Sequence, residues 1–408
     1  MKTSLRILVS GLIAQHPKLG GMSWHYLQFV SGLHRLGHDV FYIEDSGEWP
    51  YNLDGGLTGS DYSSNTCVAN IRYLQQVMQS CGLDERWAYR CPVDATWSGP
   101  CASNVADLVA SADLLINVSG TLARPQEYRG VPVLAYIDTD PVFTQIRLLR
   151  KEAGFTEAVN MHDRYFSFGQ CLPGVLPATG HRWLPTRQPV LMDAWRASEA
   201  PRNAYTTVMN WASYACEEFG ALRFGQKDIE FAKFLDLPSR VPDVRLEIAV
   251  RGTRKGHLPG HDESREPEDL LRVLTSKGWA VVDAIEVCAS FEDYRQHIQN
   301  SRAEWSIAKN AYVAGKAGWF SDRSACYLAA GRPAVLQDTG FQPALPVGEG
   351  LLVFSDIDEA AEAIRRVESD HSRHSRAARA IAEQFFNSDK VLSNLLEQAF
   401  AQPAETAA

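Results

Sequence analysis

The stretch LRILVSGLIAQHPKLGGMSWHYLQFVSGLHRLGHDVFYIED, residues 5–45, decides the fold class. An apolar run at residues 5–9 is followed by a loop containing Gly20-Gly21, and then by apolar residues at helical spacing over 24–36. A second apolar run occupies residues 40–43. Strand, loop, helix and strand form one βαβ unit, which predicts a parallel sheet covered on both faces.

The alternation of strands and helices continues to the end of the chain. In the first half we expect strands at residues 113–118, 131–137 and 164–168, and helices at 65–80 and 104–110. In the second half we expect strands at 205–210, 245–250, 279–283, 305–309, 333–337 and 351–354. Helices are expected there at 228–235, 267–276, 291–300 and 323–330, with two or three more over 357–400. The predicted fold class is α/β, with two Rossmann-like domains.

Prolines 185, 189 and 201 interrupt a polar stretch and mark an interdomain linker. We predict an N-terminal domain over residues 1–195, a linker over 196–205, a second domain over 206–385, and a terminal helix and tail over 386–408. Residues 49–64 are rich in Gly, Ser, Asn and Tyr. This segment is predicted to be a long loop at the edge of the first sheet, a common place for binding contacts.

Composition limits the classes of function. The chain has 408 residues, of which 45% are hydrophobic and 22% charged, as is ordinary for a globular protein of two domains. Its net charge of -9 argues against a general binder of nucleic acid or anionic membranes. No apolar run is long enough to predict a membrane span. The oligomeric state stays open.

The eight cysteines form no CxxC pair and are too dilute for a disulfide scaffold. We therefore expect reduced, mostly buried thiols in a cytoplasmic protein.

The stretch GWFSDRSACYLAAGRPAVLQDTGF, residues 318–341, carries the clearest chemistry. It predicts a loop, a helix capped by Ser321 or Asp322, a buried strand and a polar Gly loop. A helix start offers unpaired N–H groups to phosphate oxygens, and an acidic side chain beside it can accept bonds from ribose hydroxyls. Gly340 allows close backbone approach to a ligand at a strand end, where open α/β sheets bind ligands.

The sequence around this stretch resembles the donor-binding half of the GT-B glycosyltransferase superfamily. The resemblance rests on LAAGRPAV at 328–335, DTG at 338–340 and GEGLLV at 348–353, in the order and spacing of that superfamily. The N-terminal Gly20-Gly21 loop and LHRLGHDV at 33–40 resemble its first βαβ unit. The resemblance implies two Rossmann-like domains with an interdomain crevice, and transfer of a sugar from a nucleoside diphosphate sugar to an acceptor hydroxyl.

The chain also departs from the family-four pattern within that superfamily. Its retaining enzymes carry two glutamates seven residues apart, and this chain has Gly318 and Cys326 at those places. Asp322 is the nearby carboxylate. Retention or inversion of the sugar linkage therefore stays open, and a catalytically inactive relative that binds a nucleotide sugar or a partner is the alternative function.

The resemblance and the strand ends together select a donor site in the second domain. Lys227, Arg251 and Lys309 are candidates for neutralising the diphosphate, in place of the Arg and Lys usual in the family. The predicted donor-binding residues are Asn210, Lys227, Arg251, Lys309, Ser321, Asp322, Arg323, Ser324, Asp338, Thr339 and Gly340.

Acceptor activation needs a base near the crevice, and the candidates are His16, His25 and Asp138. The predicted acceptor contacts are Gly21, Trp24 and Asp140.

Asp138 and Asp140 form a DxD pair, the pattern that binds a metal in single-domain glycosyltransferases. Because the GT-B architecture neutralises diphosphate with helix ends and cations, we expect a metal-free mechanism without a cofactor. His257, His261 and Asp262 are interpreted as part of a surface loop rather than a metal site.

The leading hypothesis is thus a glycosyltransferase whose partners are a nucleotide sugar and a small-molecule or glycan acceptor. An epimerase or phosphorylase of the same fold is a weaker third hypothesis, because no Lys lies in a convincing cofactor context.

Overall fold

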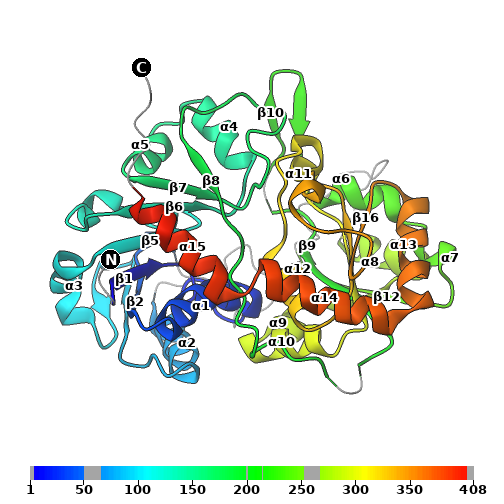
Figure 1. The fold of residues 1–408 in the computed structure, drawn as a ribbon, viewed down its shortest axis with the longest axis horizontal. Coiled ribbons are helices and arrows are strands. Elements are labelled where there is room, and N and C mark those ends of the chain that lie inside the picture. The colour runs from blue at the N-terminus through cyan, green and yellow to red at the C-terminus, as the bar shows by residue number, and fades with distance from the viewer. Residues whose placement is uncertain (1–3, 50–65, 199–200, 214, 252–266, 402–408) are drawn as a thin grey trace.

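The computed structural model describes residues 4–49, 66–198, 201–213, 215–251 and 267–401. Two α/β domains lie side by side, the N-terminal one at the left of Figure 1 and the second at the right. Both are built as the sequence predicts, from parallel strands connected by helices. The expected long loop after Trp49 and the expected loop around His257 lie outside the described residues.

The first sheet has eight strands in the order β4-β3-β2-β1-β5-β6-β7-β8. All neighbours pair in parallel except β3 and β4. The strands β1, β2, β5, β6 and β7 confirm the expected ones, whereas β3, β4 and β8 are short and were not expected. The bounds are β1 Arg6–Ser10, β2 Asp39–Glu44, β3 Trp87–Arg90, β4 Trp97–Ser98, β5 Leu114–Val118, β6 Leu134–Asp138, β7 Arg164–Ser167 and β8 Trp183–Pro185.

Helices cover this sheet on both faces, as a parallel sheet requires. Tyr26, Phe29 and Leu33 of the first helix, α1, are fully buried, because the apolar stripe seen in the sequence faces the sheet. The bounds are α1 Gly20–Arg35, α2 Val68–Ser80, α3 Val105–Ser111, α4 Phe143–Leu149 and α5 Phe155–Asn160. Short 3-10 turns occupy Ala102–Asn104 and Pro125–Tyr128.

The second sheet is parallel throughout, in the order β13-β12-β9-β14-β15-β16. Its core includes Trp211, Trp279 and Trp305 packed with Phe231. The bounds are β9 Ala204–Asn210, β12 Arg245–Arg251, β13 Ala280–Asp283, β14 Ala303–Ser306, β15 Ala334–Gln337 and β16 Leu351–Phe354. An unexpected hairpin, β10 Glu217–Phe219 and β11 Leu222–Phe224, stands apart from the sheet.

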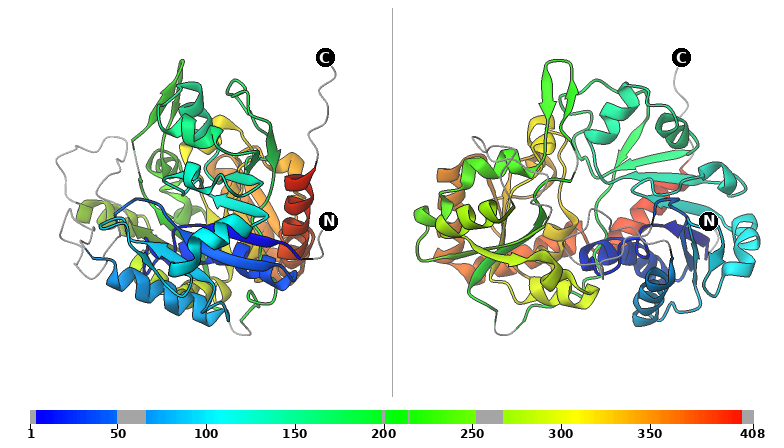
Figure 2. Two further views of the ribbon diagram at one scale, coloured as in Figure 1. Left: turned by 90° about the vertical axis from the view of Figure 1, so that its left-hand side faces the viewer. Right: turned by 180° about the vertical axis from the view of Figure 1, so that it is seen from behind.

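The helices of the second domain are α6 Lys227–Phe231, α7 Leu237–Arg240, α8 Pro267–Ser276, α9 Ala284–Cys288, α10 Phe291–Gln299, α11 Asn310–Gly315, α12 Asp322–Ala329, α13 Ile357–Ser369 and α14 His371–Phe385. The last helix, α15 (Ser388–Phe400), crosses back and packs on α1 of the first domain (Figure 2). At this contact Gly32 lies against Leu392. The chain therefore passes between the domains twice, once before β9 and once before α15.

Further details differ from the sequence predictions, which also did not include the helices α4, α5, α7 and α9. The strand expected at 305–309 is β14, Ala303–Ser306, so Lys309 lies beyond it as the residue that precedes α11. The helix α11 was not expected. The prediction that all cysteines are reduced is wrong at Cys67 and Cys91, which form a disulfide between the start of α2 and the end of β3.

None of the helices among the described residues is both long enough and apolar enough to cross a bilayer.

The domain interface uses residues that the sequence assigned to the acceptor. Trp24 is buried, packs on Trp195 and Phe291, and donates its indole N–H to the Phe291 carbonyl at 2.6 Å. Gly20 and Gly21 begin α1 rather than forming a loop, and they lie against Ser290 and Tyr294 of the second domain. Trp24 and Gly21 thus join the two domains, a role that the sequence analysis did not predict, and their predicted contacts with an acceptor stay predictions.

The interface predicts a steric effect at Gly20. A Cβ atom on Gly20 would lie 2.2 Å from the Ser290 carbonyl oxygen, which is backbone and cannot rotate away. We expect Gly20→Ala to lower the free energy of unfolding by about 1–3 kcal/mol, measured by urea denaturation. Gly130→Ala is the control, because its Cβ would meet only a Val109 methyl at 3.7 Å. Equal midpoints for the two variants would contradict this close contact.

Candidate active site

The carboxyl edges of the two sheets meet at the domain interface, and His25 lies between them. Its Nδ1 is 3.5 Å from the Asp322 carboxylate, which begins α12 in the other domain. Burial alone would raise the pKa of Asp322, but the hydrogen bond from His25 and the charges of His25 and Arg323 outweigh it and hold that pKa below its usual value. The two residues, predicted separately as base and donor contact, form one pair.

The other ring nitrogen of His25 faces a hydroxyl pair. Its Nε2 lies 3.4 Å from Ser119 Oγ, and Thr139 Oγ1 donates to that same oxygen at 2.8 Å. Ser119 follows β5 with a φ of 63°, a left-handed conformation that costs energy for any residue with a side chain. The sequence prediction did not include Ser119, because nothing in the local pattern shows that its backbone turns this way.

Lys227 is the most informative cation of the site. It is partly buried at the start of α6 and, in the portion of the chain described, has neither a hydrogen bond nor an ion pair. Burial, with the nearby charges of Arg323 and Lys309, holds the pKa of Lys227 well below its usual value, and Glu304 and Asp322 offset this only in part. A lysine kept among other cations without a carboxylate partner is suited to receive an anion.

The start of α12 lies beside these cations. Ser321 precedes the helix and Ser324 is fully buried. Within the described residues the Ser324 hydroxyl has no hydrogen-bond partner. It lines a pocket of about 20 Å³, the space of one water-sized group, which Ser321, Trp319 and Thr339 also border. This pocket thus offers a buried hydroxyl close to the N-terminal end of a helix, where negative charge is favoured.

Lys309 joins the domains instead of standing free. Its ammonium is 3.1 Å from Asp140 of the first domain, whose carboxylate also accepts a bond from the Tyr312 hydroxyl. The Lys309 ammonium further lies over the rings of Phe143 and Tyr312, at 5.1 and 5.3 Å from their centroids. Lys309 and Asp140 were predicted in separate donor and acceptor sites, and the structure brings them into contact.

Arg323 is tied inside its own domain. Its guanidinium donates to Glu304 at 2.7 Å, to Ser306 at 2.6 Å and to the Val208 carbonyl at 2.6 Å. Burial opposes ionisation, but the buried Glu304 charge raises the pKa of Arg323. With its three nitrogens occupied, Arg323 holds the start of α12 against β9 and β14.

A second buried carboxylate, Glu230, organises the same edge. It accepts bonds from Lys233 at 2.9 Å, from Asn310 at 2.7 Å and from Gln337 at 2.5 Å. These partners lie on or beside α6, on α11 and on β15. Glu230 therefore fixes the positions of the elements that present Lys227, Lys309 and the loop after β15. The sequence prediction missed it, because a Glu inside a short helix normally faces water.

The loop after β15 is fixed mainly by its own bonds. Asp338 pairs with Lys316 at 2.9 Å and accepts from the Gly340 N–H at 2.8 Å. Burial opposes ionisation of Asp338, but its bonds to Lys316 and Gly340 hold its pKa below the usual value. Gly340 has a φ of +90°, and a Cβ atom on it would lie 3.0 Å from the Lys316 carbonyl oxygen. Thr339 is buried and donates its hydroxyl to the Trp319 carbonyl. These three residues border the site, and their predicted donor contacts stay predictions.

Asp138 is a framework residue. It is buried and accepts from Thr144 at 2.7 Å, Ser167 at 2.9 Å and Gln145 at 3.0 Å. Burial raises its pKa to about 6, although these bonds oppose the rise. Both carboxylate oxygens are occupied by protein donors, so Asp138 shapes the turn that carries Asp140.

His16 and Arg251 lie near each other on opposite domains. Burial, with the added charge of Arg251, lowers the pKa of His16 to about 4. Arg251 ends β12 beside Asn210, which is exposed at the end of β9. The loop before His16 is held by the buried Glu44, which accepts from the N–H groups of Ala14 at 2.8 Å and Gln15 at 2.6 Å.

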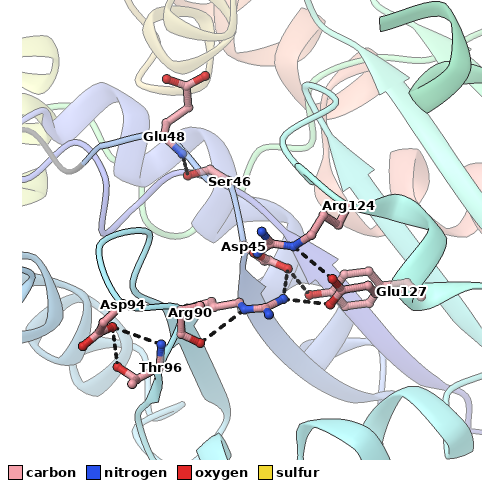
Figure 3. A network of polar contacts seen from close by, with 10 residues as sticks. Asp45, Ser46, Glu48, Arg90, Asp94, Thr96, Arg124 and Glu127 are labelled. Atoms are coloured by element: carbon pink, nitrogen blue, oxygen red, sulfur yellow. Dashed lines mark hydrogen bonds and ion pairs between the residues drawn. The ribbon is translucent and has the colours of Figure 1, made fainter. Parts of the chain in front are cut away.

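A further polar network lies at the rim of the first sheet, next to the end of β2 (Figure 3). Asp45 is buried and accepts from Arg124 at 2.6 Å and from Tyr128 at 3.0 Å, with Arg90 at 3.4 Å. Arg90 also pairs with Glu127 at 2.7 Å. The network joins the loops after β2 and β5 to the end of β3.

The positions matching the family glutamates carry no carboxylate. Cys326 is buried in α12 and lies 3.8 Å from the Gln28 amide nitrogen, and Gly318 has a φ of +75° beside Cys171. Among the described residues no three His, Cys, Asp or Glu side chains gather as metal ligands. His257, His261 and Asp262 lie outside the described residues.

No family model matches the sequence, and comparison with curated proteins finds no match either. Solved structures do match. An alpha-glucosyltransferase in complex with UDP and a 13-mer DNA has a TM-score of 0.58 at 12% identity, over 98% of this chain and 100% of that one. HepE from Anabaena, in complex with UDP and glucose, has a TM-score of 0.56 at 12% identity, over 98% of this chain and 100% of that one.

Sucrose-phosphate synthase from Thermosynechococcus elongatus matches with a TM-score of 0.51 at 10% identity, over 97% of this chain and 98% of that one. The likeness to these structures extends along nearly the whole chain and shows its fold. The chain has the GT-B fold, which the sequence resemblance had implied.

The buried Glu44 predicts a pH dependence of stability. Burial raises its pKa to about 7 from 4.5, so the folded chain favours the protonated carboxyl. The stabilisation is complete below pH 4.5 and is lost as pH rises to 7. Relative to Glu44→Gln, the wild type should lose about 3 kcal/mol of unfolding free energy over that range. Glu48→Gln, at an exposed neighbour, is the control and should track the wild type; parallel curves for Glu44→Gln would refute the assignment.

Proposed function

We propose that this chain is a glycosyltransferase that moves a sugar from a nucleoside diphosphate sugar to an acceptor hydroxyl. The observation that carries the proposal is Lys227, a partly buried ammonium with no hydrogen-bond or ion-pair partner among the described residues, beside Lys309 and the start of α12. A diphosphate supplies the negative charge that this arrangement lacks within the described residues. The matched structures of HepE and alpha-glucosyltransferase, which hold UDP, support the same donor class.

In this proposal the donor diphosphate lies over Lys227, with Arg251 and Lys309 as further cations. The start of α12 and the Ser324 hydroxyl bind phosphate oxygens and stabilise the charge that develops as the diphosphate leaves. In this proposal the Lys309 ammonium leaves its ion pair with Asp140 and forms one with the diphosphate. Because Asp138 and Asp140 are already engaged by protein donors, we propose that these cations, without a metal, neutralise the leaving group.

His25 is the proposed acid–base group. Asp322 accepts a hydrogen bond from the Nδ1–H group of His25. The unprotonated Nε2 then faces Ser119 and the incoming hydroxyl, from which it can take a proton. His16, with a pKa of about 4, is a much weaker base at neutral pH. Asp138 serves as a positioning residue for Asp140. The acceptor is proposed to be a small molecule or glycan, since the net charge of -9 disfavours nucleic acid.

A cytoplasmic location stays a proposal, and the Cys67–Cys91 disulfide counts against it, since disulfides are rare in reducing compartments.

Lys227→Met tests the donor site directly. Removing a partly buried charge that has no partner among the described residues should leave the melting temperature unchanged or raise it. It should weaken UDP binding by about 10- to 100-fold in calorimetry. Lys277→Met is the control, because Lys277 is exposed and pairs with Asp236 at 2.8 Å. Unchanged UDP affinity in a folded Lys227→Met protein would remove Lys227 from the donor site.

A catalytically inactive nucleotide-sugar-binding protein is the second candidate, favoured by Cys326 and Gly318 at the family glutamate positions. His25→Gln distinguishes the two. For an enzyme, transfer or hydrolysis of labelled nucleotide sugars should fall by about 10²- to 10⁴-fold with little change in UDP affinity. His34→Gln, on the outer end of α1, is the control. Binding without any turnover by the wild type, across nucleotide sugars and acceptors, would favour the inactive protein.

A further inference from the structure

A groove lined by arginines lies at the opposite end of α12 from the candidate donor site. Its volume is about 470 Å³, within the range of pockets that hold small molecules. Four arginines and one glutamate are its charged residues, so the groove carries three positive charges in excess. The lining residues that the argument uses are Arg196, Arg332, Arg376, Arg379 and Glu383, with the turn at Gly331.

Two of these arginines are held by backbone oxygens. Arg332 is only 4% exposed, and its guanidinium donates to the carbonyls of Gln299 and Ser198 at 2.6 and 2.9 Å. Arg379 donates to the carbonyls of Met192 and Trp195, both at 3.0 Å. Carbonyl dipoles orient a guanidinium without neutralising its charge, and burial lowers the pKa of Arg332. Within the part of the chain that the structure describes, only Arg379 of the two has a carboxylate partner, Glu383 at 2.8 Å.

The other two arginines stand at the rim. Arg196 belongs to the segment that connects the domains, and Arg376 lies on α14. Both are exposed, and across the described ranges neither forms a hydrogen bond or an ion pair. The positive charges of these arginines repel one another, and an anion in the groove would relieve that repulsion. Guanidinium groups also suit phosphate, because each can offer paired N–H donors to phosphate oxygens.

We propose that this groove binds a phosphate-bearing ligand, as a site separate from the donor site. Arg332 and Arg379 form its base and supply the fixed charge, while Arg196 and Arg376 close over the anion from the two sides. A free phosphorylated small molecule and the phosphate headgroup of an anionic lipid share this chemistry.

Because of the position of the groove, binding of an anion there would affect the contact between the two domains. Arg332 and Arg379 already fasten the connecting segment at Met192, Trp195 and Ser198 to the second domain. An anion bridging Arg196 to Arg376 adds a further tie between that segment and α14. The same helix α12 presents Asp322 to His25 at its other end, so occupancy is expected to alter how the two domains meet. This second step rests on the proposed function, whereas binding itself does not.

Calorimetry with inorganic pyrophosphate tests the site. The double variant Arg196→Gln/Arg376→Gln removes two exposed, unpaired charges and should keep the wild-type melting temperature. We expect it to weaken pyrophosphate binding at the groove by on the order of tenfold or more. Arg182→Gln/Arg223→Gln makes the same change of charge at two other exposed positions and is the control. Lys227→Met should retain the groove binding, because Lys227 lies at the other site.

The outcomes separate the two proposals. Loss of pyrophosphate binding in the groove variant alone supports the groove. Equal pyrophosphate affinity in the groove variant and the wild type overturns the groove proposal. Complete loss of pyrophosphate binding in Lys227→Met also overturns the groove proposal, and the proposed donor site is then retained. If Lys227→Met instead leaves UDP affinity unchanged, the proposed function fails and the groove result stands by itself.

Vesicles distinguish the source of the phosphate. If the ligand is a lipid headgroup, the wild type should sediment with phosphatidylglycerol vesicles and not with phosphatidylcholine vesicles, and the groove variant should lose this binding. If it is a soluble molecule, pyrophosphate should bind and neither vesicle should. Vesicle binding that the groove variant retains in full, together with unchanged pyrophosphate affinity, rejects the site.

Discussion

Charge pairs across the domain interface are the constraint on which the rest of this structure depends. His25 with Asp322 and Lys309 with Asp140 each place one partner on either domain, at the carboxyl edges of the two sheets. Separating the domains would leave each of these groups without its partner. The buried Trp24 contact fixes how closely the edges approach. The interface therefore sets the geometry of the proposed chemistry as well as the arrangement of the domains.

Buried carboxylates fix the elements at the carboxyl edges of the two sheets. Glu304 compensates Arg323 under α12, Glu230 joins α6, α11 and β15, and Glu44 holds the loop before His16. These carboxylates bind protein donors, and among the described residues Lys227 has no carboxylate partner. In the proposed donor site, the charges around Lys227 are thus paired within the protein, and the charge of Lys227 is left for the anion.

The order of strands and helices could be predicted from the sequence, because apolar runs and helical periodicity report burial directly. Such runs predict the bounds of β16 as the structure has them, and the start of β9 to within one residue. The shift of β14 has a physical cause: Glu304 interrupts the apolar pattern, and only Arg323 from a distant helix allows it to be buried. The fold class was read from patterns that are local, whereas this burial depends on a contact between distant residues.

The sequence predicts which residues lie in the candidate site better than it predicts which of them contact one another. Asp322 was predicted from a helix start, His25 from the Gly-rich loop after the first strand, and Lys227 as a cation in place of the family's Arg and Lys. That Asp322 faces His25, or that Lys309 faces Asp140, depends on how two domains meet, which no spacing within either domain reveals. The part of Gly21 and Trp24 in the domain contact was missed for the same reason, because a glycine and a tryptophan near a strand end suit a ligand and a domain contact equally well.

The return of α15 to the first domain has a consequence for the order of folding. Its packing beside Gly32 covers a face of α1 that is synthesised more than 350 residues earlier. During synthesis the face of α1 that α15 covers therefore stays uncovered until α15 itself has been made. Nascent chains that have not yet reached α15 expose this apolar face, and exposed apolar surface of this kind is prone to aggregate and is bound by chaperones.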